Sequence, residues 1–356
     1  MASDGALQDS VQGVNETAHL PKAYIVILNW NGWKDTIECL ESVFRNNYPN
    51  FRVIVCDNDS TNGSVERIQD WADGNLQVQV DIKNPLYTRS FPPVEKPIRW
   101  VEYNREQAEA GGDREIGEPP LVLIRTGGNL GFAAGNNVGL RYALARNDFE
   151  YAWLLNNDTV IDASALTEMI RQMIAEPKSG MCGSLLLYYH EPEKVQTAGG
   201  GRYYKLLGGG RHISEGNCVS EILDRNKVLN RLDYIIGASM LVHKPFLQHV
   251  GLMCEDYFLY FEEIDWALRA KTNFSLTYTE KSIVYHKHGG STRGQNEIGI
   301  IPEYYGMRNR LVFTRKFYPY ALPAIYAGLA FACLMRLKKG RMDRVRMILK
   351  LLALGK

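Results

Sequence analysis

The residues best suited to chemistry in this sequence are Asn156-Asn157-Asp158, which directly follow the apolar run Tyr151 to Leu155. Such a run predicts a buried strand, so the two amides and the carboxylate would stand at its carboxyl end. Open α/β sheets bind ligands at that edge, and a carboxylate there can hold a hard divalent cation, which in turn holds phosphate oxygens. The alternative is a polar turn, because Asn and Asp are common turn residues.

Three further apolar runs end in polar residues. They are Ala23 to Leu28, which ends at Asn29; Phe51 to Cys56, which ends at Asp57-Asn58; and Ser275 to Tyr285, which ends at His286. Because the carboxyl ends of parallel strands share one edge, these side chains are expected to converge. Asp158 with an imidazole, diphosphate oxygens and water would make a Mg²⁺ or Mn²⁺ site. A lone His is more often structural, but His286 and His288 beside Gly-Gly favour a ligand.

A second acidic group, Glu262, Glu263 and Asp265, stands at the start of a predicted helix that continues to Ala270. Crowded carboxylates repel one another, so one pKa tends to rise, which suits a general base. The alternative is that the acids complement the helix dipole, which explains one or two of the three. The neighbouring aromatic residues are expected in the core rather than on a sugar-stacking surface: Phe258, Tyr260, Phe261 and Trp266.

A glycine-rich stretch, GGNLGFAAGNN over residues 127–137, follows another apolar run, Leu121 to Ile124. Its glycines allow a tight turn and a close approach to a ligand, and its asparagines add hydrogen-bond donors and acceptors. It matches neither GxGxxG nor GxxxxGK[ST], so the dinucleotide fingerprint and the Walker loop do not fit.

Helices are expected to alternate with these strands. They cover residues 34–46, Ser64 to about Trp71, the stretch after the glycines to about Arg146, and 163–176, and further strands cover Gly180–Leu187 and Tyr234–His243. This alternation predicts an α/β fold, a mostly parallel sheet flanked by helices. Residues 85–120 are expected to form an inserted, partly mobile loop, either a solvated excursion or a lid, and residues 190–230 an irregular stretch.

Length, net charge and cysteine spacing say less about function than these motifs do. The 356 residues suit one large or two modest domains, and a net charge of +1 gives no argument for a nucleic-acid partner. Six cysteines without CxxC spacing predict reduced thiols rather than disulfides or zinc. Residues 1–20 are polar and lack a signal-peptide apolar region, so we expect a loose tail and a cytoplasmic protein.

The C-terminal segment, 316–356, is expected to be helical. Residues 317–335 carry no charge and are barely long enough to span a membrane. Basic residues follow them: Arg336, Lys338, Lys339, Arg341, Arg344 and Arg346. This pattern favours a surface-lying contact with anionic lipid on the inner face of the cell membrane. The alternative is a helical hairpin packed on the domain or on a second subunit of a homodimer.

Six stretches together resemble family 2 inverting glycosyltransferases of the GT-A fold, close to bacterial rhamnosyltransferase-like enzymes of cell-surface polysaccharide assembly. They are VILNWNGWKDTIECLESV, VIVCDNDSTNGS, NLGFAAGNN, LLNNDTVI, FEEIDWALRA and VYHKHGGST, spread over residues 23–293 in the family's order. The resemblance implies a GT-A domain over 21–315, with 85–120 as its inserted loop.

The same resemblance implies roles for individual residues. Asp158 would be the metal ligand of the family's Asp-x-Asp motif, whose first position here is Asn156, and His286 the second protein ligand. Glu263 would be the catalytic base, one methylene longer than the family's usual Asp, with Glu262 and Asp265 as alternatives. The expected nucleotide-sugar contacts are Asn29 and Asp57 at the base and ribose, with Asn58, Asn129, Gly131, Asn136 and Asn157 nearby.

The implied reaction moves a sugar from a dTDP- or UDP-linked donor, dTDP-L-rhamnose first, to a glycan or polyprenyl-linked acceptor. Inversion needs one carboxylate to activate the acceptor hydroxyl and a cation to neutralise the departing diphosphate, whereas glycoside hydrolysis needs two carboxylates. A nucleotide-sugar-binding module without catalysis is a rival hypothesis, and Glu263 argues against it. A nucleotidyltransferase would favour a glycine-rich basic loop after the first strand, where NWNGW stands.

Overall fold

The computed structural model describes residues 20–222, 224–287, 293–294 and 297–354. The expected N-terminal tail, except its last residue, and His288 with the two glycines after it lie outside the described residues. All six cysteines are free thiols, as expected.

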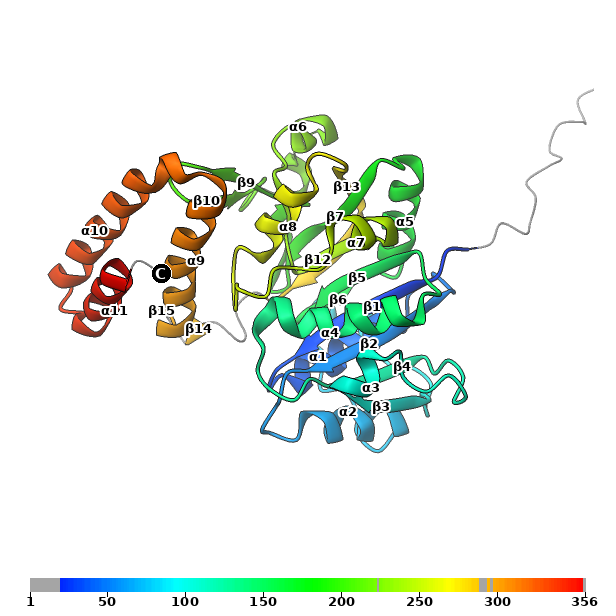
Figure 1. Ribbon diagram of the computed structural model, residues 1–356. Coiled ribbons are helices and arrows are strands. Elements are labelled where there is room, and N and C mark those ends of the chain that lie inside the picture. Colours follow the sequence, from blue (N-terminus) through cyan, green and yellow to red (C-terminus); the bar gives the residue numbers. More distant parts are fainter. Residues whose placement is uncertain (1–19, 223, 288–292, 295–296, 355–356) are drawn as a thin grey trace, which may run out of the picture.

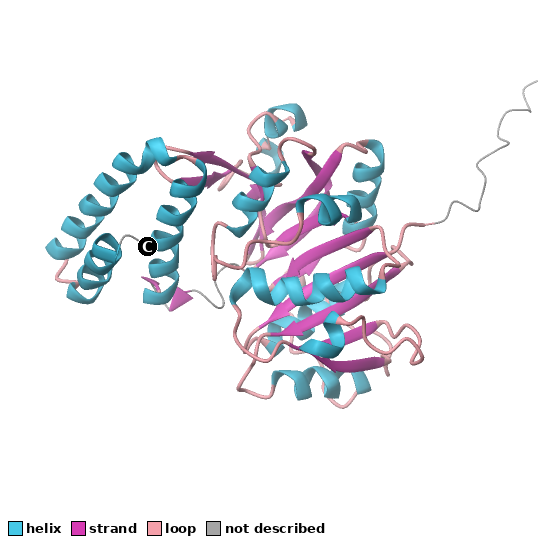
Figure 2. Ribbon diagram, viewed as in Figure 1, coloured by secondary structure: helices cyan, strands magenta, loops and turns pink. Residues whose placement is uncertain are grey.

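A ten-stranded, mostly parallel sheet forms the centre of the described part of the chain (Figures 1 and 2). In sheet order its strands are β3 (Trp100–Asn104), β4 (Leu121–Arg125), β2 (Phe51–Asp57), β1 (Ala23–Asn29), β5 (Tyr151–Asn156), β12 (Ser239–His243), β7 (Ser179–Tyr188), β13 (Ser275–His286) and β6 (Thr159–Ile161), with β8 (Glu191–Ala198) paired beside β7. Strands β3, β4, β2, β1 and β5 run parallel to one another, and β13 runs parallel to β7.

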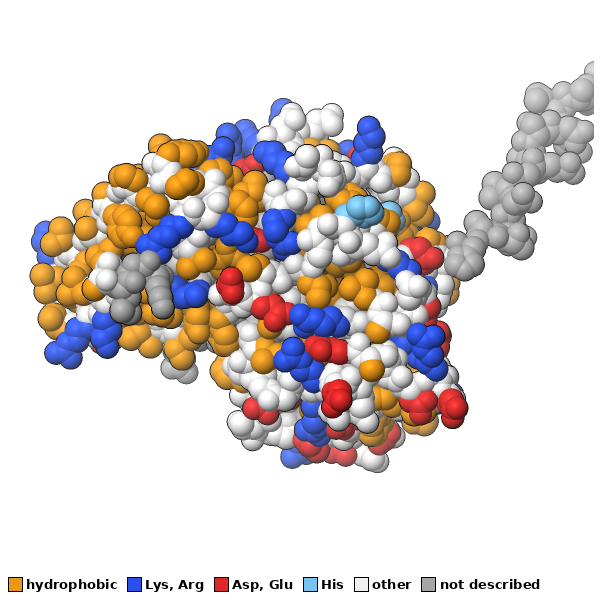
Figure 3. Space-filling model, in the orientation of Figure 1, with side chains coloured by type: hydrophobic (Ala, Val, Ile, Leu, Met, Phe, Trp, Pro, Cys, Tyr) orange, Lys and Arg blue, Asp and Glu red, His pale blue; other side chains and the backbone are white. Residues whose placement is uncertain are grey.

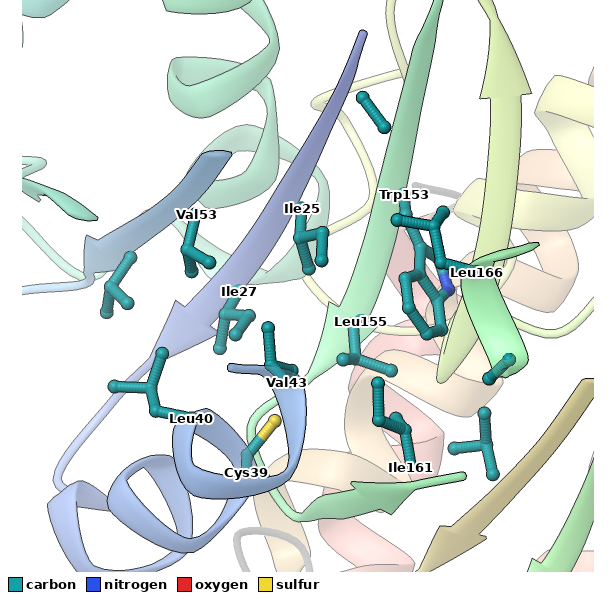
Figure 4. Packing of buried hydrophobic residues seen from close by; sticks show 14 of the residues in the cluster. Ile25, Ile27, Cys39, Leu40, Val43, Val53, Trp153, Leu155, Ile161 and Leu166 are labelled. Atoms are coloured by element: carbon teal, nitrogen blue, oxygen red, sulfur yellow. The ribbon is translucent and has the colours of Figure 1, made fainter. Parts of the chain in front are cut away.

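Helices cover both faces of this sheet. They are α1 (Trp33–Val43), α2 (Ser64–Asp73), α3 (Arg105–Glu109), α4 (Gly131–Arg146), α5 (Ala165–Ala175), α6 (Arg225–Leu229), α7 (Lys244–Val250) and α8 (Glu262–Ala270). Strand β1 is apolar throughout because its alternate residues enter different cores. Ile25 and Ile27 face Leu40 of α1 (Figure 4), whereas Tyr24 and Val26 pack in the core under α4, α7 and α8.

Two expectations about irregular segments were wrong. Residues 85–120 contain a short 3-10 helix (Tyr87–Arg89), α3 and the edge strand β3, which pairs in parallel with β4 from Trp100 opposite Leu121. The prolines of this segment hid the strand, although they lie on either side of it rather than within it. Residues 190–230 contain β8, a 3-10 turn (Val219–Glu221), α6 and the hairpin of β9 (Gly200–Tyr204) and β10 (Gly209–His212).

The predicted strand Tyr234–His243 is in fact two strands in two sheets. Its first part, β11 (Tyr234–Ile235), pairs with β9 in a three-stranded sheet, and its second part, β12, lies between β5 and β7. The small residues between them allow the chain to change sheet.

Three helices follow the sheet domain: α9 (Ile300–Phe317), α10 (Leu322–Lys338) after a 3-10 turn (Pro319–Ala321), and α11 (Met342–Leu354). Leu311, Leu329 and Ile348 bring them together in a separate apolar cluster. Phe313 of α9 packs against Phe261 and Tyr203, which joins this bundle to the sheet domain (Figure 1). A short hairpin, β14 (Arg293–Gly294) with β15 (Glu297–Ile298), precedes α9.

Candidate active site

The ends of β1 and β2 and the turn after β5 carry a connected network of amides and one carboxylate. Asn29 donates from Nδ2 to Asp57 Oδ2 at 2.7 Å, directly across the β1–β2 pair. Thr36 Oγ donates to Asn29 Oδ1 at 2.7 Å and receives Asn157 Nδ2 at 3.0 Å. Three residues expected at the nucleotide are therefore fixed together. Thr36 was not expected in this group; it lies in the first turn of α1, seven residues after Asn29.

The glycine-rich turn joins the same edge. Asn58 donates from Nδ2 to Asn129 Oδ1 at 3.0 Å, and Asn129 Oδ1 also accepts the Gly131 N–H at 3.2 Å. Gly131 has φ +79°, and a Cβ there would lie 2.3 Å from the Phe258 carbonyl oxygen, so a side chain is excluded. Asn136, by contrast, is buried within α4 and donates to the carbonyl of Phe132.

Helix α4 also holds the segment that leads to the acidic group. The Phe132 N–H donates to the Phe258 carbonyl at 2.8 Å. Asn137 donates from Nδ2 to the Met253 carbonyl at 2.9 Å and accepts the Met253 N–H at 3.2 Å. Residues 253–261 are thereby fastened to the helix that begins at the expected nucleotide contacts, so the two predicted groups of site residues share one support.

Asp158 and His286 meet across β6 and β13. His286 pairs with Thr159 in the antiparallel register, and the Lys287 N–H donates to the Asp158 carbonyl at 2.9 Å. These backbone contacts place Asp158 Oδ1 3.1 Å from His286 Nε2. Burial would raise the pKa of Asp158, but the charge and hydrogen bond of His286 outweigh it and lower that pKa.

The other ring nitrogen of His286 is 2.9 Å from Gln196 Oε1 on β8. An amide oxygen accepts, so the contact with Gln196 places a proton on Nδ1 and orients Nε2 toward the Asp158 carboxylate. A proton or a cation between Nε2 and the carboxylate oxygen makes this close contact favourable. Gln196 was missed because it lies at the start of the stretch expected to be irregular.

The residues present fit a divalent cation at this pair. A carboxylate oxygen suits Mg²⁺ or Mn²⁺, and the imidazole nitrogen 3.1 Å from it would be a second ligand of the same ion. Among the residues that the structure describes, no group of three His, Cys, Asp or Glu side chains forms a complete metal cluster. The remaining ligands would have to be water and phosphate oxygens.

The first turn of α8 holds the acidic group. Glu262 is buried and Glu263 partly so, and within the described structure the Oε2 atom of each is buried without a hydrogen-bond partner. Burial raises the pKa of Glu262 well above its usual range, and the charge of Glu263 adds to the effect. Burial likewise raises the pKa of Glu263 to about 7. Glu263 is thus the more accessible carboxyl, and it titrates near neutral pH.

Asp265 is bound differently, although it was expected in the same catalytic group. It is fully buried, with Arg269 Nε 2.6 Å from Oδ1 and Lys316 Nζ 2.7 Å from Oδ2. Both of its carboxylate oxygens therefore serve an ion-pair network that ties α8 to α9. The aromatic residues divide as well: Phe261 and Trp266 are in the core, whereas Tyr260 is 38% exposed and Phe258 stacks on Tyr305.

Two solved structures share this fold. A mannosyltransferase from Pyrobaculum calidifontis, in complex with GDP-Man and Mn²⁺, superposes with a TM-score of 0.51 and 13% identity over 94% of this chain and 86% of that one. The enzyme GalNAc-T7, with UDP, GalNAc and Mn²⁺, gives a TM-score of 0.55 and 11% identity over 93% of this chain and 56% of that one. The sheet domain therefore has the GT-A fold.

The family follows from the sequence. The model of glycosyl transferase family 2 matches residues 24–84 and 103–231, more than half of the chain, so the protein belongs to that family. The matched ranges include the ends of β1, β2 and β5 but stop before Glu262, Glu263 and His286. The family match therefore does not extend to those three residues.

A curated relative adds a closer comparison. The low-salt glycan biosynthesis hexosyltransferase Agl10 of Haloferax volcanii is 24% identical over 197 residues, which are 55% of this chain. The match spans 59% of that relative's length.

The contacts of Asp265 predict a loss of stability on substitution. Asp265→Asn leaves Arg269 and Lys316 without their shared counterion, and the free energy of unfolding should fall by about 2–3 kcal/mol, at or just below the lower limit for a broken buried pair because Lys316 is partly exposed. Urea unfolding measures it, with Asp256→Asn, at an exposed position of the same segment, as the control. Equal stability of the two variants would contradict the structural role of Asp265.

Proposed function

We propose that this protein is an inverting, metal-dependent glycosyltransferase that moves a sugar from a nucleotide-diphosphate donor to an acceptor hydroxyl. The proposal depends on one observation above all: a carboxylate oxygen of Asp158 and the imidazole Nε2 of His286 lie 3.1 Å apart at the carboxyl edge of the sheet. A divalent cation bound there would neutralise the diphosphate of a donor. Family membership and the GT-A fold agree with such a donor.

The chain's own residues would orient the donor. Asn29 and Asp57 are buried at the strand ends, and their mutual hydrogen bond holds them ready for a base and a ribose. Asn129 and Gly131 would stand beside the nucleotide, in a turn that Asn58 holds through Asn129 Oδ1. Asn157 is held by Thr36 on the side next to Asp158.

Glu263 would take the proton of the acceptor hydroxyl. As the acceptor oxygen bonds to the anomeric carbon, the bond from that carbon to the diphosphate oxygen breaks, and the proton passes to a carboxylate oxygen of Glu263. One carboxylate suffices for a single displacement with inversion. A pKa near 7 lets Glu263 be ionised at neutral pH while it remains basic enough to accept the proton.

The donor and acceptor are proposed more specifically. L-rhamnose from dTDP-L-rhamnose is the first donor to test, on the strength of the sequence motifs. UDP-linked hexoses and GDP-mannose follow, because the curated relative is named a hexosyltransferase and a protein of the same fold was solved with GDP-Man. The proposed acceptor is a glycan or a polyprenyl-linked saccharide of cell-surface polysaccharide synthesis. A panel of nucleotide sugars tests these choices through metal-dependent hydrolysis or transfer.

The C-terminal helices are proposed to lie on the inner face of the membrane, with the catalytic domain in the cytoplasm. The helix over Pro319–Lys338 is long and apolar enough to cross a bilayer by length and composition alone, and 17% of its apolar window is buried. Exposed apolar side chains such as Phe331 and Leu334 cover the bundle (Figure 3). Arg336 and Arg344 hold Glu303 inside the bundle, so anionic lipid would meet Lys338, Lys339 and Arg346. The alternative occupant of this face is a second copy of the chain.

The metal site generates the first functional prediction. Asp158→Ala removes the anionic ligand, so Mn²⁺- or Mg²⁺-dependent donor binding should be lost while the protein remains folded. His286→Ala should weaken metal dependence in the same direction. Calorimetric titration with donor and metal measures both, with Asp256→Ala as the control. Full activity in excess chelator would contradict the metal site, and an effect confined to His288 would shift the second ligand by two residues.

The proposed role of Glu263 generates the second functional prediction. Glu263→Gln keeps the shape but removes the proton acceptor, so turnover should fall by about 10²–10⁴-fold with donor affinity nearly unchanged. Turnover of the wild type should fall as pH drops below about 7, because protonated Glu263 cannot accept a proton. Since burial makes ionised Glu263 costly, Glu263→Gln should not lower the unfolding temperature at pH 8.

Glu262→Gln and Asp265→Asn provide the comparison in the same assay. They should cost less in turnover, and Asp265→Asn should act mainly through stability. Normal turnover of Glu263→Gln beside an inactive Glu262 or Asp265 variant would move the base to that other position.

The exposed C-terminal helices generate the third functional prediction. The full chain should sediment with vesicles that contain anionic phospholipid and less with neutral vesicles, because apolar and basic side chains both face outward. A chain that ends at residue 316 should stay in the supernatant. Equal sedimentation of the shortened chain would exclude these helices as the membrane contact. A concentration-dependent dimer that the truncation abolishes would support the second copy instead.

A further inference from the structure

A polar pocket of about 390 Å³ lies on the β9–β10 hairpin and has no role in the site described so far. Arg202 and Arg211 line it, and they stand directly opposite each other in the antiparallel register of β9 and β10. Like charges at directly opposed positions destabilise a strand pair. Both side chains are exposed, and within the described chain no acidic side chain forms an ion pair with either of them.

The rest of the lining strengthens this positive charge. Arg231, just before β11, contributes a third guanidinium, against the single carboxylate of Glu215. Ser214 has φ +62°, and its buried hydroxyl has no hydrogen-bond partner in the described structure. Three guanidinium groups and an unused hydroxyl thus outnumber the one carboxylate in the lining. Arg side chains bind phosphoryl oxygens through two parallel hydrogen bonds, so the missing acceptor has the chemistry of a phosphate.

The pocket lies next to both halves of the proposed active site. Its loop is tied to β8 and β9, since Ala198 N–H donates to the Ile213 carbonyl at 2.9 Å and Ile213 N–H donates to the Gly200 carbonyl at 3.1 Å. The same strand β8 carries Gln196, which orients His286. On the other side, β9 pairs with Tyr234 of β11, which feels the charges of both Glu215 and Glu263.

We propose that this pocket binds a phosphoryl or diphosphate group of the acceptor, at a distance from the hydroxyl that Glu263 deprotonates. The inference rests on the proposed function, because it assigns the pocket to the acceptor of that reaction. The donor diphosphate is accounted for by Asp158 and His286, so the arginine pocket is available for a second anionic group. The acceptor is thus a phosphorylated saccharide, either free or linked through its diphosphate to a lipid.

Binding of diphosphates to the full-length protein in excess chelator tests the pocket without requiring transfer. The probes are inorganic pyrophosphate and farnesyl diphosphate, measured by calorimetry. The double variant R202Q/R211Q should bind them about tenfold or more weakly, since a hydrogen bond to a charged group contributes about 1.5–3 kcal/mol. Without a probe its unfolding temperature should match or exceed that of the wild type, because the opposed charges are gone.

Two control variants separate the explanations. Lys205→Gln removes a nearby exposed charge outside the pocket and should bind the probes like the wild type. Asp158→Ala should also bind them normally, because the donor site is not involved. Equal affinity of the wild-type protein for pyrophosphate and farnesyl diphosphate supports a free phosphorylated acceptor. Tighter binding of farnesyl diphosphate supports a lipid-linked acceptor.

The opposite results would overturn the inference. They are unchanged binding by R202Q/R211Q, an equal loss in Lys205→Gln, a loss in Asp158→Ala, or weaker donor binding in the double variant. If no nucleotide sugar is ever transferred but the double variant still loses diphosphate binding, the proposed function fails and the anion pocket remains.

Discussion

The site depends on the close pairing of the Asp158 carboxylate with the His286 imidazole. Gln196 engages one ring nitrogen of the imidazole, and the β6–β13 pairing sets the other 3.1 Å from a carboxylate oxygen. Buried acceptors are costly unless a donor or a cation satisfies them. The fold thus maintains a position that favours positive charge at the edge of the sheet. The polar side chains at the carboxyl ends of β1 and β2 lie at the same edge.

Close backbone approach connects this position to the acid group. Gly131 allows the start of α4 to contact the Phe258 carbonyl, and Asn137 one turn and a half later fixes Met253. A larger residue at Gly131 would push residues 253–261 away and displace Glu263 from the donor side. The same tertiary support therefore holds residues 253–261, and the proposed base Glu263 after them, against the helix whose start is bonded to Asn58 at the end of β2.

Much of this arrangement could be predicted from the sequence, because strands buried on both faces read as continuous apolar runs. That pattern located β1, β2 and β5 and placed Asn29, Asp57 and Asp158 at one edge. Edge strand β3 and hairpin β9–β10 were missed, since prolines and glycines dominate their surroundings and neither strand is apolar throughout. Local sequence could not show that Asp265 is neutralised by Lys316, 51 residues away, or that Gln196 orients His286. Such contacts are set by tertiary packing.

The central claim is that a cation and the donor diphosphate meet between Asp158 and His286. Anomalous diffraction from crystals grown with Mn²⁺ and a nucleoside diphosphate tests it most directly. The account predicts a manganese peak in contact with Asp158 Oδ1 and His286 Nε2, with the diphosphate on the same ion and the nucleoside beside Asn29 and Asp57. A nucleotide bound elsewhere, or one bound at this edge while Asp158 and His286 stay joined by a proton, would contradict it.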